Sequence, residues 1–136
     1  MSARAASSGP VVLVVDDESL IRWSLRERLE TAGYEVLEAE TGLEALAAFK
    51  ARAVGLVLVD LSLPELDGLG VLERVKRERP ACPVIVMTAY DSPGTAERAR
   101  ALGAAHFVTK PFDFDRLLGL VSSALPPPDR PATTPV

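Results

Sequence analysis

The stretch Val11-Val12-Leu13-Val14-Val15-Asp16-Asp17-Glu18 decides the fold class of this chain. Its first five residues form a continuous apolar run that is rich in β-branched side chains. Such a run is typical of a strand in a parallel sheet, because helices cover both faces of the strand. Three acidic residues follow at once, at the strand end where open α/β sheets bind their ligands.

Four more short apolar runs follow, and helical patterns separate them. The predicted strands are Val11–Val15, Tyr34–Ala39, Leu56–Val59, Val84–Met87 and His106–Val108. The first predicted helix has Ile21, Leu25, Leu29 and Ala32 on its apolar face. The next three are Leu43–Ala51, Gly68–Arg79 and 93–102, the last of which starts after a Ser92 cap. Asp113 caps the fifth helix, whose inner face has Leu117, Val121 and Leu125. This alternation predicts an α/β fold: a (βα)5 doubly wound, five-stranded parallel sheet with helices on both faces, a three-layer sandwich.

The length and composition are those of one globular domain. The chain has 136 residues, of which 48% are hydrophobic and 25% charged. We expect a flexible arm at 1–9, a folded domain at 10–125, and a Pro-rich tail or the start of a linker at 126–136. The longest apolar run, 10–15, is far shorter than a membrane-spanning helix.

Charge and cysteine content indicate which binding partners and which cellular compartment to expect. The net charge is −4, and no stripe of Lys and Arg stands out, so we expect no direct binding of nucleic acid. The single cysteine, Cys82, cannot form an internal disulfide, which favours a reducing compartment and hence the cytoplasm.

Polar side chains gather where the predicted strands end. Asp16 and Asp17 follow the first strand, Asp60 the third, Thr88 the fourth and Lys110 the fifth. Three carboxylates side by side would repel one another, and a divalent cation that prefers hard oxygen ligands, Mg²⁺, would relieve the repulsion. A carboxylate can also attack phosphorus, and phosphoryl transfer needs positive charge and hydrogen-bond donors on the phosphoryl oxygens. The set is complete for accepting an activated phosphoryl group.

At these positions the sequence resembles the receiver domain of bacterial two-component response regulators. The resemblance covers about 11–125 and rests on Asp16-Asp17, Asp60 with Pro64 and Gly68 after it, Thr88-Ala89, and Lys110-Pro111-Phe112. It implies a flavodoxin-like fold, a signalling role rather than turnover of an outside substrate, and a sensor histidine kinase or phosphotransfer protein as phosphoryl donor.

The resemblance also implies a role for each residue of the site. Asp60 would be the phosphoacceptor. Mg²⁺ would be bound by Asp17 and Asp60 directly, by the Ser62 backbone carbonyl, and by Asp16 through water. Lys110 would contact the phosphoryl group, and the Lys110–Pro111 bond would be cis.

Further residues would carry the switch and the kinase contact. Thr88 would be the switch hydroxyl and Phe107 the switch aromatic, changing the surface of the fourth helix, fifth strand and fifth helix, through which a homodimer could also form. The expected kinase-docking residues on the first helix are Leu20, Ile21, Ser24 and Arg28.

Two segments are similar to one class of receiver in particular. Ile21-Arg22-Trp23 and 111–115 resemble receivers of the nitrogen-regulator class of sigma-54-dependent activators. Those proteins continue into an ATPase and a DNA-binding domain, which this sequence does not contain. Both a stand-alone receiver and a receiver excised from a longer chain remain open.

Three other functions can be compared with these residues. An aspartyl-phosphate phosphatase of the haloacid dehalogenase type needs an Asp two residues after its nucleophile, where this chain has Ser62. A flavodoxin-like cofactor binder would not place three acidic residues after its first strand. A receiver that mediates contacts without phosphorylation stays an alternative.

The roles of two aromatic residues stay open. Trp23 is either a packed aromatic or part of a docking patch. Tyr90 is a candidate shield for the acyl phosphate.

Overall fold

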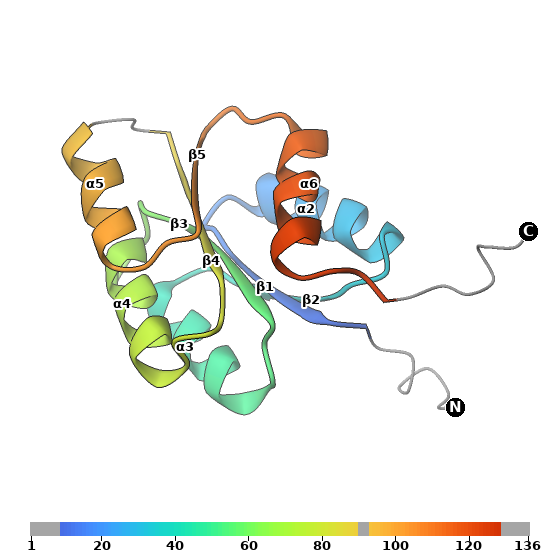
Figure 1. Ribbon diagram of the computed structural model, residues 1–136, viewed down its shortest axis with the longest axis horizontal. Coiled ribbons are helices and arrows are strands. Elements are labelled where there is room, and N and C mark those ends of the chain that lie inside the picture. Colours follow the sequence, from blue (N-terminus) through green and yellow to red (C-terminus); the bar gives the residue numbers. More distant parts are fainter. Residues whose placement is uncertain (1–8, 90–92, 129–136) are drawn as a thin grey trace, which may run out of the picture.

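The fold is an α/β sandwich built on one parallel sheet (Figure 1). The computed structural model describes residues 9–89 and 93–128. The strands are β1 (Val11–Val15), β2 (Glu35–Ala39), β3 (Leu56–Asp60), β4 (Val84–Thr88) and β5 (His106–Thr109). The helices are α2 (Ser19–Thr31), α3 (Gly42–Ala51), α4 (Gly68–Glu78), α5 (Pro93–Ala101) and α6 (Phe114–Ala124). The strand order β2-β1-β3-β4-β5 with all pairs parallel confirms the predicted fold class.

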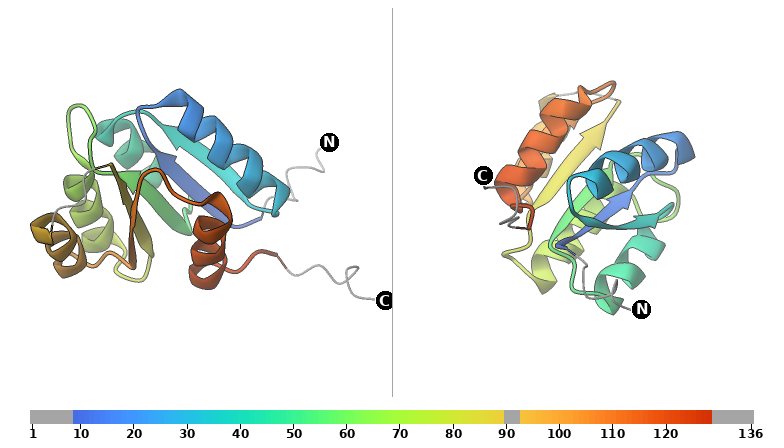
Figure 2. Two further views of the ribbon diagram at one scale, coloured as in Figure 1. Left: turned by 90° about the horizontal axis from the view of Figure 1, so that it is seen from above. Right: turned by 90° about the vertical axis from the view of Figure 1, so that its right-hand side faces the viewer.

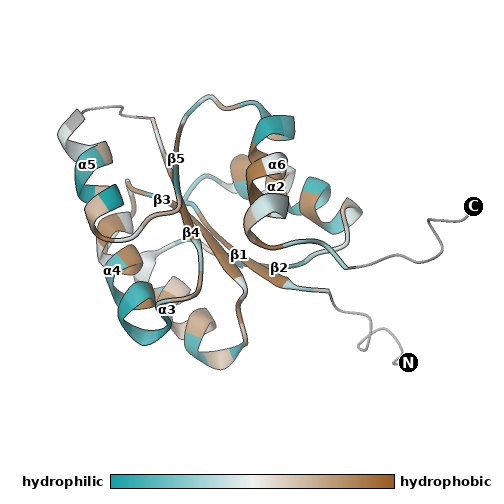
Figure 3. Cartoon of the chain, in the orientation of Figure 1, coloured by the Kyte–Doolittle hydropathy of each residue, from teal (hydrophilic) through white to brown (hydrophobic). Residues whose placement is uncertain are grey.

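Alternate residues of each central strand face opposite helical layers. Helices α3, α4 and α5 cover one face, where the strands contribute Leu13, Val15, Val57, Val59, Val84 and Val86. Helices α2 and α6 cover the other face, where the strands contribute Val12, Val14, Leu56, Leu58, Ile85 and Met87. Figure 2 shows the sheet between the two helical layers, and Figure 3 shows apolar strands with polar outer helix surfaces. The continuous apolar runs therefore reflect burial on both faces.

The strand ends differ from the prediction in a way that matters for the site. Asp60, Thr88 and Thr109 belong to their strands, because Asp60 pairs with Met87 and Thr88 with Thr109 in the parallel ladders. The prediction stopped each strand at its last apolar residue. The polar residues at these ends are thus held by the sheet itself, and Tyr34, predicted in β2, lies just before it.

Helix ends follow the predicted signals closely. The Asp113 side chain accepts hydrogen bonds from the amides of Asp115 and Arg116, as a helix cap does. Gly33 follows α2 with a φ of 104°, a conformation that favours glycine. Leu125 lies beyond the end of α6 but still packs against the core. The predicted Ser92 cap and Tyr90 fall outside the described residues.

The first helix buries one residue that the prediction did not select, although the predicted apolar residues do pack against the core. Arg22, Leu25 and Leu29 are its buried residues, whereas Ile21 is half-buried. Arginine is rarely buried without partners, so the sequence pattern favoured Ile21. The partners that allow Arg22 to be buried come from the end of β1 and from β2.

The turn between α2 and β2 meets the last described residues at the amino end of the strands, opposite the acidic cluster. The Tyr34 hydroxyl donates a hydrogen bond of 2.6 Å to the Leu125 carbonyl. A β-carbon added at Gly33 would lie 3.1 Å from Pro128, so the first residues of the Pro-rich stretch rest on the turn after α2. None of the helices in the described part of the chain combines the length and apolar character needed to cross a membrane.

Candidate functional site

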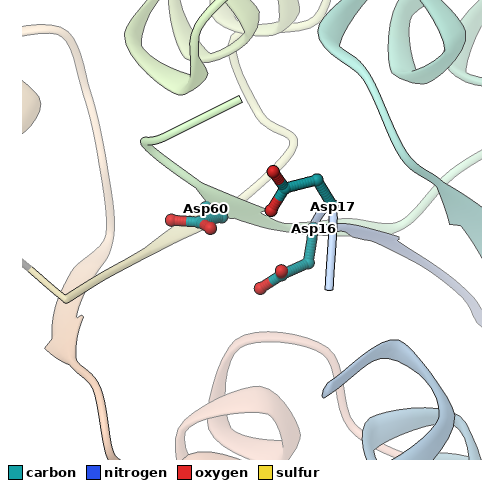
Figure 4. A group of neighbouring side chains, drawn as sticks. All are labelled: Asp16, Asp17 and Asp60. Atoms are coloured by element: carbon teal, nitrogen blue, oxygen red, sulfur yellow. The ribbon is translucent and has the colours of Figure 1, made fainter. Parts of the chain in front are cut away.

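Three carboxyl groups meet at the carboxyl end of the sheet. Asp16 and Asp17 follow β1, and Asp60 is the last residue of β3, the neighbour of β1 (Figure 4). Each offers a carboxylate oxygen, and these oxygens lie within 4.8 Å of one another. Asp16 and Asp60 are buried, whereas Asp17 is exposed. The topology therefore brings together the three acids that the sequence analysis selected.

Lys110 joins the acidic cluster from the segment after β5. Its Nζ donates to Oδ2 of Asp16 at 2.8 Å, to Oδ2 of Asp60 at 3.1 Å and to Oε1 of Glu18 at 3.2 Å. The Lys110 amide donates to the Thr88 carbonyl at 2.7 Å, which ties this segment to β4. The Lys110–Pro111 bond is cis, as the resemblance implied.

Glu18 is the site contact that sequence analysis did not select. It is exposed, and one of its carboxylate oxygens lies beside the Lys110 ammonium. The signal was the third acid in the run that ends β1, but only the tertiary structure shows which cation it faces.

The electrostatics of the cluster follow from burial and from the shared ammonium. Burial raises the pKa of Asp16 above its usual 3.8, and the hydrogen bonds from Lys110 and the Glu18 amide offset this only in part. Burial alone would lower the pKa of Lys110, but hydrogen bonds and charges from Asp16 and Asp60 raise it well above its usual 10.5. Lys110 therefore stays protonated, and the folded site still favours additional positive charge near Asp16.

The segment that follows Asp60 holds its carboxylate in place. The Ser62 amide donates to Oδ1 of Asp60 at 3.2 Å. The Leu61 amide donates to the Met87 carbonyl, and the Gly68 amide donates to the Leu61 carbonyl. The other oxygen of Asp60 is the one that contacts Lys110. Both oxygens are thus oriented, one by backbone and one by the ammonium.

Gly68 allows α4 to approach the backbone of Asp60. A β-carbon at Gly68 would lie 2.4 Å from the Asp60 carbonyl oxygen and 2.7 Å from the Leu61 α-carbon. We expect Gly68→Ala to lower the free energy of unfolding by about 1–3 kcal/mol, because rigid backbone must move to admit the methyl group. Urea denaturation measures this.

Gly119→Ala is the matched control, since a β-carbon at Gly119 in α6 would have nothing within 4 Å. We expect that variant to be more stable than the parent by about 0.5–1 kcal/mol, because alanine favours the helix. Equal effects of the two substitutions would show that the close approach at Gly68 is unimportant.

Thr88 and Phe107 lie on the neighbouring strands β4 and β5. Thr88 ends β4 and is buried. Phe107 is paired with Val86 in the ladder between β4 and β5, and its half-buried side chain packs against the core on the α3–α4–α5 face. The two residues expected to form the switch are therefore on adjacent strands, and Thr88 ends β4 at the same rim of the sheet where Asp60 ends β3.

The residues expected to dock the kinase divide into two places on α2. Leu20 is 72% exposed, and Ile21 lines the open pocket that Asp17, Asp60 and Lys110 also line. Ser24 and Arg28 instead line a shallow groove between α2 and α6.

Trp23 lines the same groove, together with Leu118 of α6, and its side chain remains 59% exposed. The Arg28 guanidinium lies 4.6 Å from the centroid of the Phe114 ring. Because more than half of its side chain is exposed, Trp23 contributes mainly apolar surface to this groove.

The geometry agrees with the family comparison. The family model described as the response regulator receiver domain matches residues 12–122. This chain belongs to the receiver domain family. A receiver domain is a signalling module rather than a turnover enzyme, and its family implies a histidine kinase as partner.

Known relatives place this receiver domain near one group of regulators. It is 40% identical over 115 residues to the DNA-binding transcriptional regulator NtrC of Salmonella typhimurium, which is 85% of this chain and 24% of that protein. It is also 40% identical over 114 residues to the transcriptional regulatory protein ZraR of Escherichia coli O157:H7, covering 84% of this chain and 26% of that one. The chain thus spans about a quarter of the length of these curated relatives.

A solved structure gives the same result. The receiver domain of NtrX from Brucella abortus is 39% identical, with a TM-score of 0.78, covering 84% of this chain and 97% of that one.

An acidic triad such as Asp16, Asp17 and Asp60 is typical of the Mg²⁺ site of a receiver domain. The all-oxygen donor set, with carboxylate oxygens close enough to share one ion, fits that metal.

Proposed function

We propose that this receiver domain accepts a phosphoryl group on Asp60 from the phosphohistidine of a sensor histidine kinase or phosphotransfer protein, with Mg²⁺ bound. One observation carries the proposal: the Lys110 ammonium bridges the carboxylates of Asp16 and Asp60 within a triad of acids at the end of the sheet. A nucleophile, a cation-binding set and a fixed positive charge thus share one pocket.

The chemistry follows from these positions. An Asp60 carboxylate oxygen attacks the phosphorus, an oxygen–phosphorus bond forms, and the phosphorus–nitrogen bond to the donor histidine breaks. Lys110 then contacts a phosphoryl oxygen in place of an Asp60 oxygen. Asp17, Asp60 and the Ser62 carbonyl would hold Mg²⁺, and Asp16 would do so through water. The bound metal would supply positive charge to the phosphoryl oxygens.

The proposed output is a change on the surface formed by α5, β5 and α6. The phosphoryl group adds charge and acceptor oxygens at Asp60, and the Thr88 hydroxyl would turn to donate to one of them. Phe107, half-buried beside it, would then rotate into the vacated space. We propose this surface as the contact for an output partner or for a second copy of the domain.

The partner surfaces extend this proposal. The kinase would dock on α2 through Leu20, Ile21, Ser24 and Arg28, covering both the acidic pocket that Ile21 lines and the groove that Ser24 and Arg28 line. Relatives named as transcriptional regulators suggest that the switch controls transcription in a longer chain, with no nucleic acid bound by this domain. The buried thiol of Cys82 is compatible with the cytoplasm as location.

Intact mass spectrometry with acetyl phosphate as donor tests the proposal. We expect one phosphoryl adduct when Mg²⁺ is present and none when EDTA is added. Borohydride reduces an acyl phosphate of aspartate to homoserine, so peptide mapping after reduction should find homoserine at Asp60 alone. A folded protein that forms no adduct would overturn the proposal and favour a receiver that binds partners without phosphorylation.

A further inference from the structure

Arg22 is a buried cation directly behind the acidic cluster. It is 9% exposed. One guanidinium nitrogen, Nη1, donates to the backbone carbonyl of Asp16 at 2.7 Å, and this bond is itself buried. Nε donates to Oε1 of Glu38 at 3.0 Å, and Nη2 lies 3.5 Å from Oε2 of Glu40. The side chain thus connects the end of β1 to the end of β2.

We propose that Arg22 is a positioning residue for metal binding, because it fixes the peptide group that joins Asp16 to Asp17. This inference rests on the proposed function, in which the triad binds Mg²⁺. A peptide group is planar, so holding the Asp16 carbonyl also sets the orientation of the Asp17 amide and the position of the Asp17 α-carbon that carries the side chain. Asp17 is exposed, so its position depends on the backbone that carries it.

The peptides around Asp16 are held on both sides. The Asp16 amide donates to the Ala39 carbonyl at 3.1 Å, which extends the pairing of β1 with β2. The Glu18 amide donates to Oδ1 of Asp16 at 2.9 Å. Arg22 holds the carbonyl between these two bonds. Without it, the Asp16 carbonyl would lose a charge-assisted bond in a buried position, and the peptide could rotate.

An arginine suits this place better than a lysine. Its planar group presents donors in several fixed directions and can serve the Asp16 carbonyl and Glu38 at once. Glu38 is shared with Arg26, whose Nη1 lies 2.5 Å from Oε2 of Glu38. Partial burial would raise the pKa of Glu38, but hydrogen bonds from Arg26 and Arg22 lower it below its usual 4.5. The Arg22 charge is therefore paired at neutral pH.

The charge of Arg22 and its proposed positioning role predict opposite effects of its removal on Mg²⁺ affinity. By Coulomb's law alone, removing a cation near a metal site strengthens Mg²⁺ binding. If Arg22 positions the Asp16–Asp17 peptide, its loss weakens binding, and changes of this kind behind a metal site typically cost about 10–100-fold in affinity. The sign of the change therefore separates the two effects.

The test is Mg²⁺ affinity by isothermal titration calorimetry for wild type, Arg22→Gln and Arg26→Gln. We expect Arg22→Gln to bind Mg²⁺ at least 10-fold more weakly. Arg26→Gln also removes a partner of Glu38 but none of Asp16, so its affinity should stay within about twofold of wild type. Arg22→Lys should fall between the two, since an ammonium can serve the carbonyl or Glu38 but not both.

Each outcome has a separate meaning. Equal or tighter Mg²⁺ binding by folded Arg22→Gln would overturn the positioning role, whatever its effect on stability. If Arg22→Gln does not fold, the Mg²⁺ affinity of Arg22→Lys is the deciding measurement. An affinity equal to that of the wild type, or reduced no more than in Arg26→Gln, would overturn the inference. A wild-type protein that binds no Mg²⁺ would instead refute the proposed function on which this inference rests.

Discussion

Replacing Asp60 with asparagine is expected to abolish the Mg²⁺-dependent phosphoryl adduct completely. The amide oxygen of asparagine is a far weaker nucleophile than a carboxylate, so no acyl phosphate can form at this position. Asparagine has nearly the same shape and keeps an oxygen that can accept the bond from the Ser62 amide. The variant also removes one of three clustered carboxylates, so we expect it to fold. Intact mass with acetyl phosphate measures the result.

Asp67→Asn is the matched control for this prediction. Asp67 lies in the same segment between β3 and α4, and its side chain caps α4 by accepting from the Gly70 amide at 2.9 Å. Asparagine is an equally good cap, so this variant should be labelled like the wild type. An adduct that persists in Asp60→Asn would mean that another residue accepts the phosphoryl group.

Replacing Lys110 with methionine should have the largest effect on stability. It leaves the carboxylates of Asp16 and Asp60 buried without the ammonium that both contact. Removing one partner of a buried ion pair typically lowers the free energy of unfolding by about 3–5 kcal/mol, and we expect a loss of about 3 kcal/mol in EDTA at neutral pH. Urea denaturation measures the loss.

The pH dependence of this loss has a definite sign. In the wild type, the raised pKa of Lys110 means that its stabilising contribution is fully present below its usual pKa of 10.5. In Lys110→Met, the pKa of Asp16, already raised by burial, rises further because the ammonium is gone. A carboxyl group whose pKa is raised by folding destabilises the fold at pH values above its unfolded-state pKa, so the deficit should shrink as pH falls from neutral toward the usual pKa of 3.8.

Added Mg²⁺ should restore stability more in Lys110→Met than in the wild type, because a cation then replaces the missing charge. Lys76→Met is the control: the Lys76 ammonium donates to the carbonyls of Pro80 and Cys82, not to carboxylates. That variant should lose about 1 kcal/mol and show no response to Mg²⁺. A Lys110→Met deficit independent of both pH and Mg²⁺ would contradict the electrostatic account.

The predicted layer architecture came from local patterns that depend on burial. Val12–Val15 in β1 and the similar run in β3 are buried on both faces, and a strand of that kind needs helices on both sides. The placement of Asp16 and Asp60 at one rim followed from topology, because parallel strands end at the same edge. The predicted strand ends were less accurate than the predicted layers, because Thr88 and Thr109 pair in the ladder although they are polar.

The structure adds one residue to the predicted inner face of α2. Periodicity selected Ile21, which is half-buried and packs against the core, but it did not select Arg22, which is buried. A cation can be buried only where acceptors converge, and those of Arg22 are the Asp16 carbonyl and carboxylates near the end of β2. Such convergence depends on strand pairing and cannot be read from the helix alone.

The sequence by itself determined the α/β class, the order of elements and the identity of the clustered acids, because these depend on apolar periodicity and on which residue follows each strand. Only the tertiary structure decided how the charges are shared. It placed the Lys110 ammonium between Asp16 and Asp60, added Glu18 at its side, and set Arg22 behind the Asp16 carbonyl. The Lys110 contacts join residues far apart in the chain, and the energies of all these contacts depend on burial that exists only once the sheet has formed.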